Sequence, residues 1–255
     1  MIFMLIDSHC HIHSKDYPDG TTAYLRAQEA GVKNIICVGT DIEDSKLAVK
    51  FSSQHDGVFA AIGIHPHEAK KDYSNIDQIK DFFNSKTKHV VAIGEIGLDY
   101  FYEHSDRILQ QQILEQQLQI AKDLKLPVIF HVRGAFDDFW PIFDNFPGVH
   151  GVLHSFTDTI ESAEKAFSRD LFIGVNGIST FTKDEKQQQL FRNVPLSKIL
   201  LETDSPYLTP KPYRGKLNEP AYVRVVAEHL AKERGISFDK VAGQTSHNAT
   251  NLFNL

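Results

Sequence analysis

The sequence predicts an α/β fold of the TIM or (β/α)8 barrel class, in a single domain over residues 1–255 with an extra C-terminal helix. Two observations support this. Eight short apolar runs alternate with longer segments of helical spacing, and 255 residues suit eight such units. A doubly wound open sheet is the alternative, but no G-x-G-x-x-G motif follows the first apolar run.

The eight apolar runs are the expected strands, because near-continuous apolar stretches of this length are typical of buried parallel strands. They cover residues 3–7, 34–38, 58–63, 89–94, 127–131, 149–154, 171–175 and 198–202. After Pro220 the pattern predicts two helices that separate near Gly235 and Ile236, the last of them over 239–253 as a covering helix.

The clearest expected helix is 106–124, where an apolar face repeats at helical spacing through Leu109, Ile113, Ile120 and Leu124. This helix is also rich in glutamine. We expect the glutamines to form its solvated side; they are Gln110, Gln111, Gln112, Gln116, Gln117 and Gln119.

Composition narrows the class of protein. A hydrophobic content of 42% and a charged content of 24% are ordinary for a soluble globular domain. The net charge of −6 argues against coating duplex nucleic acid by bulk electrostatics, although a local basic loop could still bind a nucleic-acid substrate. Two cysteines provide no disulfide framework, and no apolar run approaches a membrane span. We therefore expect a cytoplasmic protein with no membrane segment.

Six side chains of metal-ligand type stand at or just after the ends of expected strands. They are His9, His11, Glu95, His131, His154 and Asp204. Imidazoles and carboxylates together are ligands for divalent cations. In a (β/α)8 barrel the functional groups lie on the C-terminal rim, so we expect these six to converge there, with His65 facing the same rim.

Local context adds to this interpretation. His9 and His11 are two residues apart, so in an extended chain both point to the same side. Glu95 follows the apolar VVAIG, where a carboxylate must be paired or bound to a cation, and a buried arginine would be the alternative partner. Asp99 shapes the following loop or holds a water. Asp204 is the best candidate for a ligand that also takes a proton from water, whereas Glu202 is interpreted as structural.

Six ligands exceed the four of a closed zinc site, and the sequence has no thiolate cluster. We therefore expect two divalent metal ions, and such a pair activates water for hydrolysis. Mg²⁺ or Mn²⁺ would serve activity, with Zn²⁺ as the alternative that the nitrogen ligands favour.

Candidate substrate contacts come from basic and aromatic residues. Arg133, Arg214 and Lys216 could bind phosphates, although a solvated loop is the other interpretation for the last two. Four aromatic residues near strand ends could stack unpaired bases or pack the rim; they are Tyr100, Tyr102, Phe156 and Tyr207.

With these residues in place, the chain resembles the TatD family of metal-dependent deoxyribonucleases, within the amidohydrolase-like barrels. The matching motifs run end to end in the family's order: DSHCH, GIHPH, GEIGLDY, KLPVIFHVR, GVLHSF, LLETDSPYL, PYRGKLNEP and TSHNATNLF. Two positions depart from the pattern, since Gly134 and His13 stand where relatives often carry an acidic residue.

The resemblance implies the ligand sets. One ion would be held by His9, His11, Glu95 and Asp204, and the second by Glu95, His131 and His154. His65 would contact the substrate or a metal-bound water. The implied activity is 3′→5′ exonucleolytic hydrolysis of single-stranded DNA with magnesium, in DNA repair.

The leading hypothesis is a deoxyribonuclease that acts on single-stranded DNA ends, with Asp204 as base and with Glu95 and His65 also catalytic, in a monomer or weak oligomer. A hydrolase of amide or ester bonds, such as an aminoacyl-tRNA deacylase, is the alternative, because the metals suit carbonyl polarisation as well. A non-catalytic metal-binding scaffold is the third hypothesis.

Overall fold

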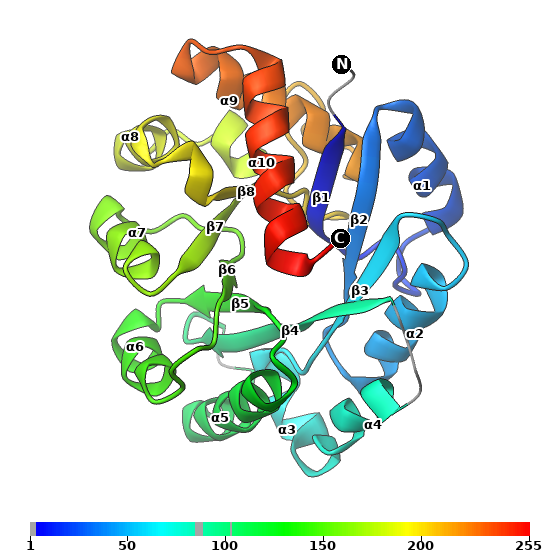
Figure 1. Ribbon diagram of the computed structural model, residues 1–255, viewed down its shortest axis with the longest axis vertical. Coiled ribbons are helices and arrows are strands. Elements are labelled where there is room, and N and C mark those ends of the chain that lie inside the picture. The colour runs from blue at the N-terminus through cyan, green and yellow to red at the C-terminus, as the bar shows by residue number, and fades with distance from the viewer. Residues whose placement is uncertain (1–3, 85–88, 103) are drawn as a thin grey trace. The chain divides into compact units, whose positions relative to one another are not determined.

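The computed structural model describes residues 4–84, 89–102 and 104–255, and strands alternate with helices through this part of the chain (Figure 1). The strands are β1 Leu5–Cys10, β2 Val32–Val38, β3 Val58–Ile62, β4 Val90–Asp99, β5 Val128–Arg133, β6 Gly151–Leu153, β7 Leu171–Val175 and β8 Ile199–Leu201. The α-helices are α1 Gly20–Glu29, α2 Ile42–Ser52, α3 Ala69–Asp72, α4 Gln78–Asn84, α5 Arg107–Leu124, α6 Phe136–Asp144, α7 Ile160–Phe167, α8 Glu185–Asn193, α9 Val223–Arg234 and α10 Phe238–Phe253. This is the element order of a (β/α)8 barrel.

Every predicted strand overlaps an observed one, although Phe3, predicted to open the first strand, lies outside the described residues. Three strands continue beyond their predicted ends: β1 runs to Cys10, β4 to Asp99 and β5 to Arg133. The predicted strand ends coincide with the ends of the apolar runs. Backbone pairing continues past them. Glu95, predicted just after a strand, therefore lies inside β4, and His131, predicted as the last residue of its strand, lies inside β5.

Contacts divide the chain into two compact units. Unit 1 comprises Met1–Cys37 and Ser155–Leu255, and unit 2 comprises Val38–His154.

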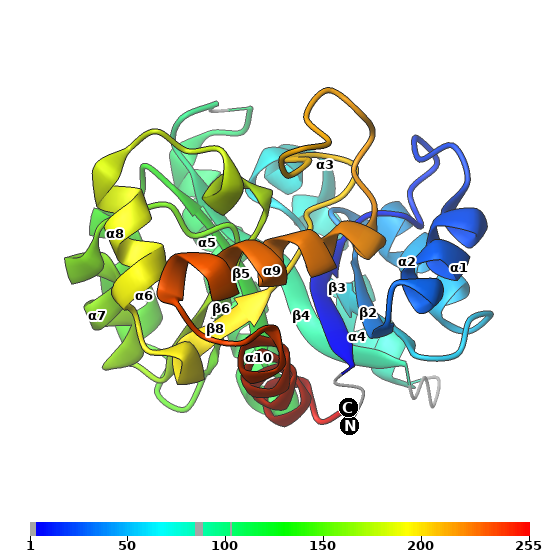
Figure 2. The same cartoon turned by 90° about the horizontal axis from the view of Figure 1, so that it is seen from above.

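In unit 1, β1 pairs with β2 and β7 pairs with β8, both in parallel. The segment after β8 joins the end of β1 through a bridge between Cys10 and Ser205. Helix α10 packs against both β1 and β8, and α9 packs against α10, as both views show (Figures 1 and 2). The two predicted C-terminal helices are confirmed, with Gly235 in the left-handed conformation at the end of α9.

A buried carboxylate strengthens the junction between β1 and the segment after β8. Asp7 is fully buried and accepts hydrogen bonds from the backbone N–H of Thr203 at 2.8 Å and from its hydroxyl at 2.6 Å. Burial raises the pKa of Asp7 well above its usual value. These bonds satisfy a polar group that would be costly to bury alone.

In unit 2, strands β3, β4, β5 and β6 pair in parallel in that order. Strands β4 and β5 approach closely at Gly97, where the backbone has a φ of +150° and a Cβ would lie 1.8 Å from the carbonyl oxygen of His131. Only glycine fits there.

The helix predicted over 106–124 is confirmed as α5, but the prediction that all its glutamines face solvent is wrong. Gln110 and Gln117 are fully buried, and Leu124, predicted on the apolar face, is 39% exposed. The Gln117 amide donates to the carbonyl of Ile64 at 3.0 Å and accepts from its N–H at 2.7 Å. A primary amide carries a donor and an acceptor together, so it can pair with the N–H and C=O of one buried residue as a neighbouring strand would. Hydrophobic spacing alone cannot reveal this.

Within the described part of the chain, no helix is both long and apolar enough to cross a bilayer.

Thr203→Val keeps the side-chain shape but removes the hydroxyl that donates to buried Asp7. We expect the free energy of unfolding to fall by about 1–3 kcal/mol, because a buried acceptor loses its partner. Urea denaturation measures this change. Thr22→Val is the control, since its hydroxyl contacts Asp19 on the surface and its loss should cost about 0.5 kcal/mol or less. Equal losses in the two variants would contradict the role of Thr203.

Candidate metal centres

The first cluster, in unit 1, consists of His9, His11 and Asp204. The Nε2 atoms of the two imidazoles lie 3.1 Å apart. Asp204 Oδ1 lies 3.7 Å from the first of them and 3.5 Å from the second. Both histidines are buried, and the Asp204 side chain is 14% exposed. Three donor atoms therefore face one another in a largely enclosed place.

Backbone bonds hold the first cluster together. The N–H of Asp204 donates to the carbonyl of His9 at 2.9 Å, and the N–H of His11 donates to the carbonyl of Ser205 at 2.7 Å. Asp204 also has a φ of +57°, a left-handed conformation that few non-glycine residues adopt. Such strained positions concentrate at functional sites because the surrounding structure must enforce them.

The second cluster, in unit 2, consists of Glu95, His131, His154 and His65. Glu95 Oε1 lies 2.9 Å from His131 Nδ1, 2.9 Å from His154 Nε2 and 3.5 Å from His65 Nε2. The donor nitrogens of His131 and His154 are 3.4 Å apart. One carboxylate oxygen thus faces three imidazoles.

Glycines on either side of Glu95 allow β4 to carry it into this cluster. At Gly94 the φ is +150°, and a Cβ would lie 2.7 Å from Ile129 of β5. The N–H of Glu95 donates to the carbonyl of Gly39 at 3.1 Å. The GEIG sequence is therefore explained by the close approach of β4 to its neighbour.

Asp99 determines how His131 is oriented. Its Oδ2 accepts from Nε2 of His131 and of His67, each at 3.0 Å, and Asp99 is itself fully buried. Because Nε2 of His131 carries the proton shared with Asp99, Nδ1 is the ring atom left to act as a ligand beside Glu95. Burial opposes ionisation, but the hydrogen bonds from the two histidines and from the backbone of Tyr102 outweigh it and hold the pKa of Asp99 well below its usual value.

Both clusters fit a divalent cation. Ligands about 2.0–2.2 Å from an ion, at tetrahedral or octahedral angles, lie about 2.8–3.6 Å from one another. The donor atoms are 3.1–3.7 Å apart in the first cluster and 2.9–3.4 Å apart among Glu95, His131 and His154. Mixed nitrogen and oxygen donors suit Zn²⁺, Mn²⁺ and related ions.

His65 also presents a neutral nitrogen to the second cluster. Its Nδ1 accepts from the N–H of His67 at 3.1 Å, and burial lowers the pKa of His65 to about 4. Its Nε2 can act as a ligand together with Glu95 and His131, since the three donor atoms lie close together. An imidazole that stays neutral at pH 7 is the form that binds metals.

The predicted phosphate contacts lie against aromatic rings. Arg133 covers the rings of Phe101 and Tyr102, and Arg214 covers Phe181 at 4.0 Å while donating to the carbonyl of Thr209. Lys216 lies 5.5 Å from the ring of Tyr213. All three cationic side chains are exposed.

The predicted stacking residues differ in exposure. Tyr102 is 51% exposed and Tyr207 is 63% exposed, whereas Phe156 is buried and contributes to packing. The Tyr100 hydroxyl donates to Asp138 at 2.8 Å.

Sequence reasoning missed two residues that position the second cluster. His67 binds Asp99, and Gln110 holds the backbone of Asp99 by accepting its N–H at 2.8 Å and donating to its carbonyl at 3.1 Å. The second histidine of GIHPH was a usable signal for His67. Nothing in the local pattern distinguishes Gln110 from its glutamine neighbours.

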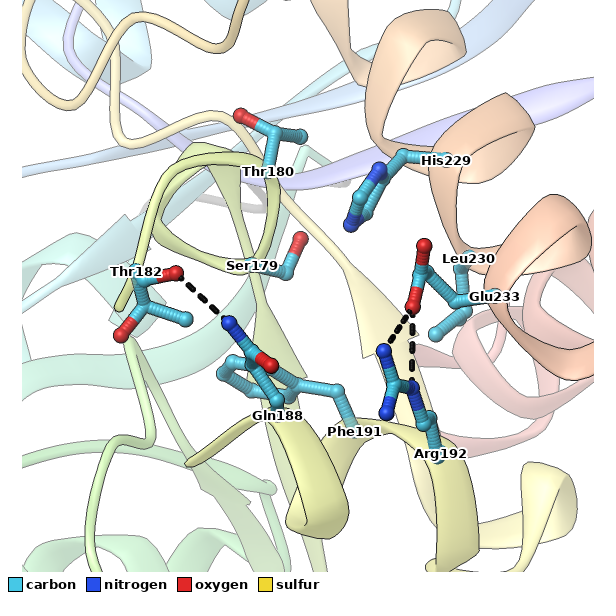
Figure 3. Close-up of a pocket in the computed structure, with 9 residues that line it drawn as sticks. All are labelled: Ser179, Thr180, Thr182, Gln188, Phe191, Arg192, His229, Leu230 and Glu233. Carbon is cyan, nitrogen blue, oxygen red and sulfur yellow. Dashed lines mark hydrogen bonds and ion pairs between the residues drawn. The ribbon is translucent and has the colours of Figure 1, made fainter. Parts of the chain in front are cut away.

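A polar cavity of about 110 Å³ lies elsewhere in unit 1, between α8, α9 and the 3₁₀ turn Gly177–Thr180 (Figure 3). Its polar groups largely bind one another: Arg192 pairs with Glu233 at 2.9 Å, and Gln188 donates to the carbonyl of Thr182 at 3.1 Å. Of the described residues lining it, none is a predicted ligand or substrate contact.

Comparison with known proteins identifies relatives over nearly the whole chain. The model of the family described as TatD-related DNase matches residues 6–254. The metal-dependent hydrolase YabD of Bacillus subtilis is 34% identical over 99% of this chain and 100% of its own length. The 3′-5′ ssDNA/RNA exonuclease TatD of Salmonella typhimurium is 34% identical over 92% of this chain and 93% of its own.

Solved structures show the fold. The crystal structure of YjjV, a TatD homologue from Escherichia coli, aligns with a TM-score of 0.93 at 31% identity and covers 100% of both chains. A TatD-family hydrolase from Entamoeba histolytica aligns with a TM-score of 0.88 at 22% identity and covers 98% of both chains. The predicted (β/α)8 barrel is confirmed.

Asp99→Asn keeps the size of the side chain but cannot accept hydrogen bonds at both of its terminal atoms. We expect the affinity of the second cluster for Mn²⁺ or Zn²⁺ to fall about 10–100-fold, because His131 loses the carboxylate that orients it. Isothermal titration calorimetry measures the affinity. Asp123→Asn, on the surface of α5 beside Gln119, is the matched control. Unchanged affinity in Asp99→Asn would contradict the orienting role.

Proposed function

Because this chain belongs to the family of TatD-related DNases, which are metal-dependent hydrolases, we propose that it removes nucleotides from the 3′ ends of single-stranded DNA by hydrolysing phosphodiester bonds. The observation that carries the proposal is the donor spacing of the second cluster, with Glu95 Oε1 2.9 Å from both His131 and His154. The 34% identity to the Salmonella exonuclease supports the choice of a nucleic-acid substrate.

Each cluster would hold one divalent cation. His9, His11 and Asp204 would be ligands in the first, and Glu95, His131 and His154 in the second. When bound, such cations activate a water molecule and neutralise charge on a phosphodiester. The sharing of Glu95 between both ions, and the choice of Mg²⁺, Mn²⁺ or Zn²⁺, stay predictions from the sequence.

The chain's own residues would move the proton and hold the substrate. Asp204 is the proposed base: its side chain is 14% exposed, so its carboxylate can accept a proton from an attacking water. His65 would offer a neutral Nε2 to the substrate or to a bound water, since its pKa is lowered to about 4. Asp99 would keep Nδ1 of His131 aimed beside Glu95.

The exposed cations Arg133, Arg214 and Lys216 are the proposed phosphate contacts. Stacking on rings restrains the two guanidinium groups, so less side-chain entropy is lost when an anion binds. A cytoplasmic location, a role in DNA repair and a monomeric or weakly associated state are further predictions.

Asp204→Asn should lower the rate of hydrolysis of end-labelled single-stranded DNA by about 10²–10⁴-fold with Mg²⁺ or Mn²⁺, because the amide cannot take up a proton. Asp170→Asn is the control: Asp170 has a φ of +59°, close to that of Asp204, and its exposed side chain pairs with Lys198. Gel analysis of the labelled products measures both the rate of hydrolysis and the direction in which the strand is digested.

The same assay, run beside an aminoacylated tRNA, separates the two hydrolase hypotheses. If the folded, metal-loaded protein leaves single-stranded DNA intact and releases the amino acid, the nuclease proposal is wrong and the acyl hydrolase replaces it. If Asp204→Asn retains most of its activity on DNA, the assignment of the base is wrong.

A further inference from the structure

We propose that Phe101, Tyr102 and Arg133 form an aromatic platform on which an unpaired base of single-stranded nucleic acid stacks. The inference rests on the proposed function and deepens it, because it assigns a binding place for the base and not only for the phosphate. It also gives Arg133 a second role beside the phosphate contact.

The exposure of the two rings is the first observation. Phe101 is 64% exposed and Tyr102 is 51% exposed. A phenylalanine that is largely exposed to water loses hydrophobic stabilisation that burial would provide. The rings meet edge to face, with centroids 4.8 Å apart and planes at 86°. A stacked base would cover the apolar surface that this arrangement leaves exposed.

Arg133 supplies charge at the same place. Its guanidinium lies 4.1 Å from the centroid of Phe101 and 4.7 Å from that of Tyr102. Because the chain carries a net charge of −6, a cation placed at the rings is needed to attract a polyanion to this surface. Aromatic faces combined with arginine are the usual means of binding single strands.

The platform is connected to the second cluster through one carboxylate. Asp99 Oδ1 accepts from the N–H groups of Phe101 at 2.9 Å and Tyr102 at 3.0 Å, while its Oδ2 binds His131 and His67. Asp99 is also the register partner of Arg133 across β4 and β5. The platform therefore lies beside a ligand of the cluster and is held by the group that orients that ligand.

The neighbours of Tyr102 divide the roles of the two rings. His104 stacks on Tyr102 with planes at 12° and centroids 5.8 Å apart, and His67 meets it edge-on at 5.7 Å. Tyr102 is thus supported from within unit 2, whereas Phe101 is the more exposed ring. We assign Phe101 as the residue that receives the base. Since every base has an aromatic face, the platform should show little sequence preference.

The test compares Phe101→Ala and Phe101→Leu with the wild-type protein. Ile108→Ala is the matched control, because Ile108 is also 64% exposed and lies in the first turn of α5. Fluorescence anisotropy in EDTA measures binding of an oligothymidylate and of an abasic oligonucleotide of equal length. We expect Phe101→Ala to weaken binding of the oligothymidylate about tenfold and that of the abasic strand less than twofold. Ile108→Ala should bind both as the wild type does.

Melting temperatures are measured first, and Phe101→Leu carries the test if the alanine variant does not fold. Leucine keeps apolar bulk but has no aromatic face, so it should still lose most of the preference for the base-bearing strand. Arg133→Lys, which keeps the charge without the planar group, should weaken binding of the oligothymidylate more than binding of the abasic strand, and equal weakening of both would contradict the place of Arg133 in the platform.

The proposed platform and the proposed nuclease activity can be contradicted independently of each other. If the wild type degrades single-stranded DNA but the Phe101 variants bind oligothymidylate normally, the platform is wrong and the nuclease stands. If the variants lose base-dependent binding while no form of the protein hydrolyses DNA, the platform stands and the nuclease is wrong. If the wild type binds neither oligonucleotide, or binds both equally, the platform is wrong.

Discussion

The hydrogen bonds accepted by the buried carboxylate of Asp99 hold the second cluster and the aromatic rings of unit 2 in place. This carboxylate is fully buried and still ionised, because four donors surround it: the imidazoles of His131 and His67 and the backbone N–H groups of Phe101 and Tyr102. One side chain thereby sets the direction of a candidate metal ligand and the course of the loop that carries the aromatic rings. A buried charge of this kind is stable only when all its partners are present.

Buried amides keep this arrangement in place. Gln110 accepts from the N–H of Asp99 and donates to its carbonyl, and Gln117 does the same for Ile64, next to His65. Each amide replaces the partner that a neighbouring strand would provide, so the buried N–H and C=O groups of Asp99 and Ile64 are hydrogen-bonded. Helix α5 therefore contributes to the site through polar groups on its buried face, beyond the apolar packing that its sequence pattern shows.

The members of the two clusters could be identified from the sequence because polar residues of their type are unusual beside apolar runs. Histidine and acidic residues next to apolar runs are costly to bury unless they bind a partner or a cation, so His9, Glu95 and His131 stand out in the sequence. The glutamines did not stand out, since the same residue type serves both a solvated face and a buried one. The aromatic rings were equally ambiguous: Phe156 is buried and Tyr102 is exposed, although both follow strand ends.

Chain order and residue type were sufficient for the barrel class, the C-terminal helices and the set of candidate ligands. These follow from apolar runs, helical spacing and residue type, which are properties of the chain itself. The tertiary structure decided which atom of each side chain faces its partners, that Gln110 and Gln117 are buried, and that Arg133 lies on two rings. Those outcomes depend on contacts between residues distant in sequence. The local pattern does not distinguish between the possible side-chain positions, whereas desolvation and hydrogen-bond geometry in the folded protein favour one of them.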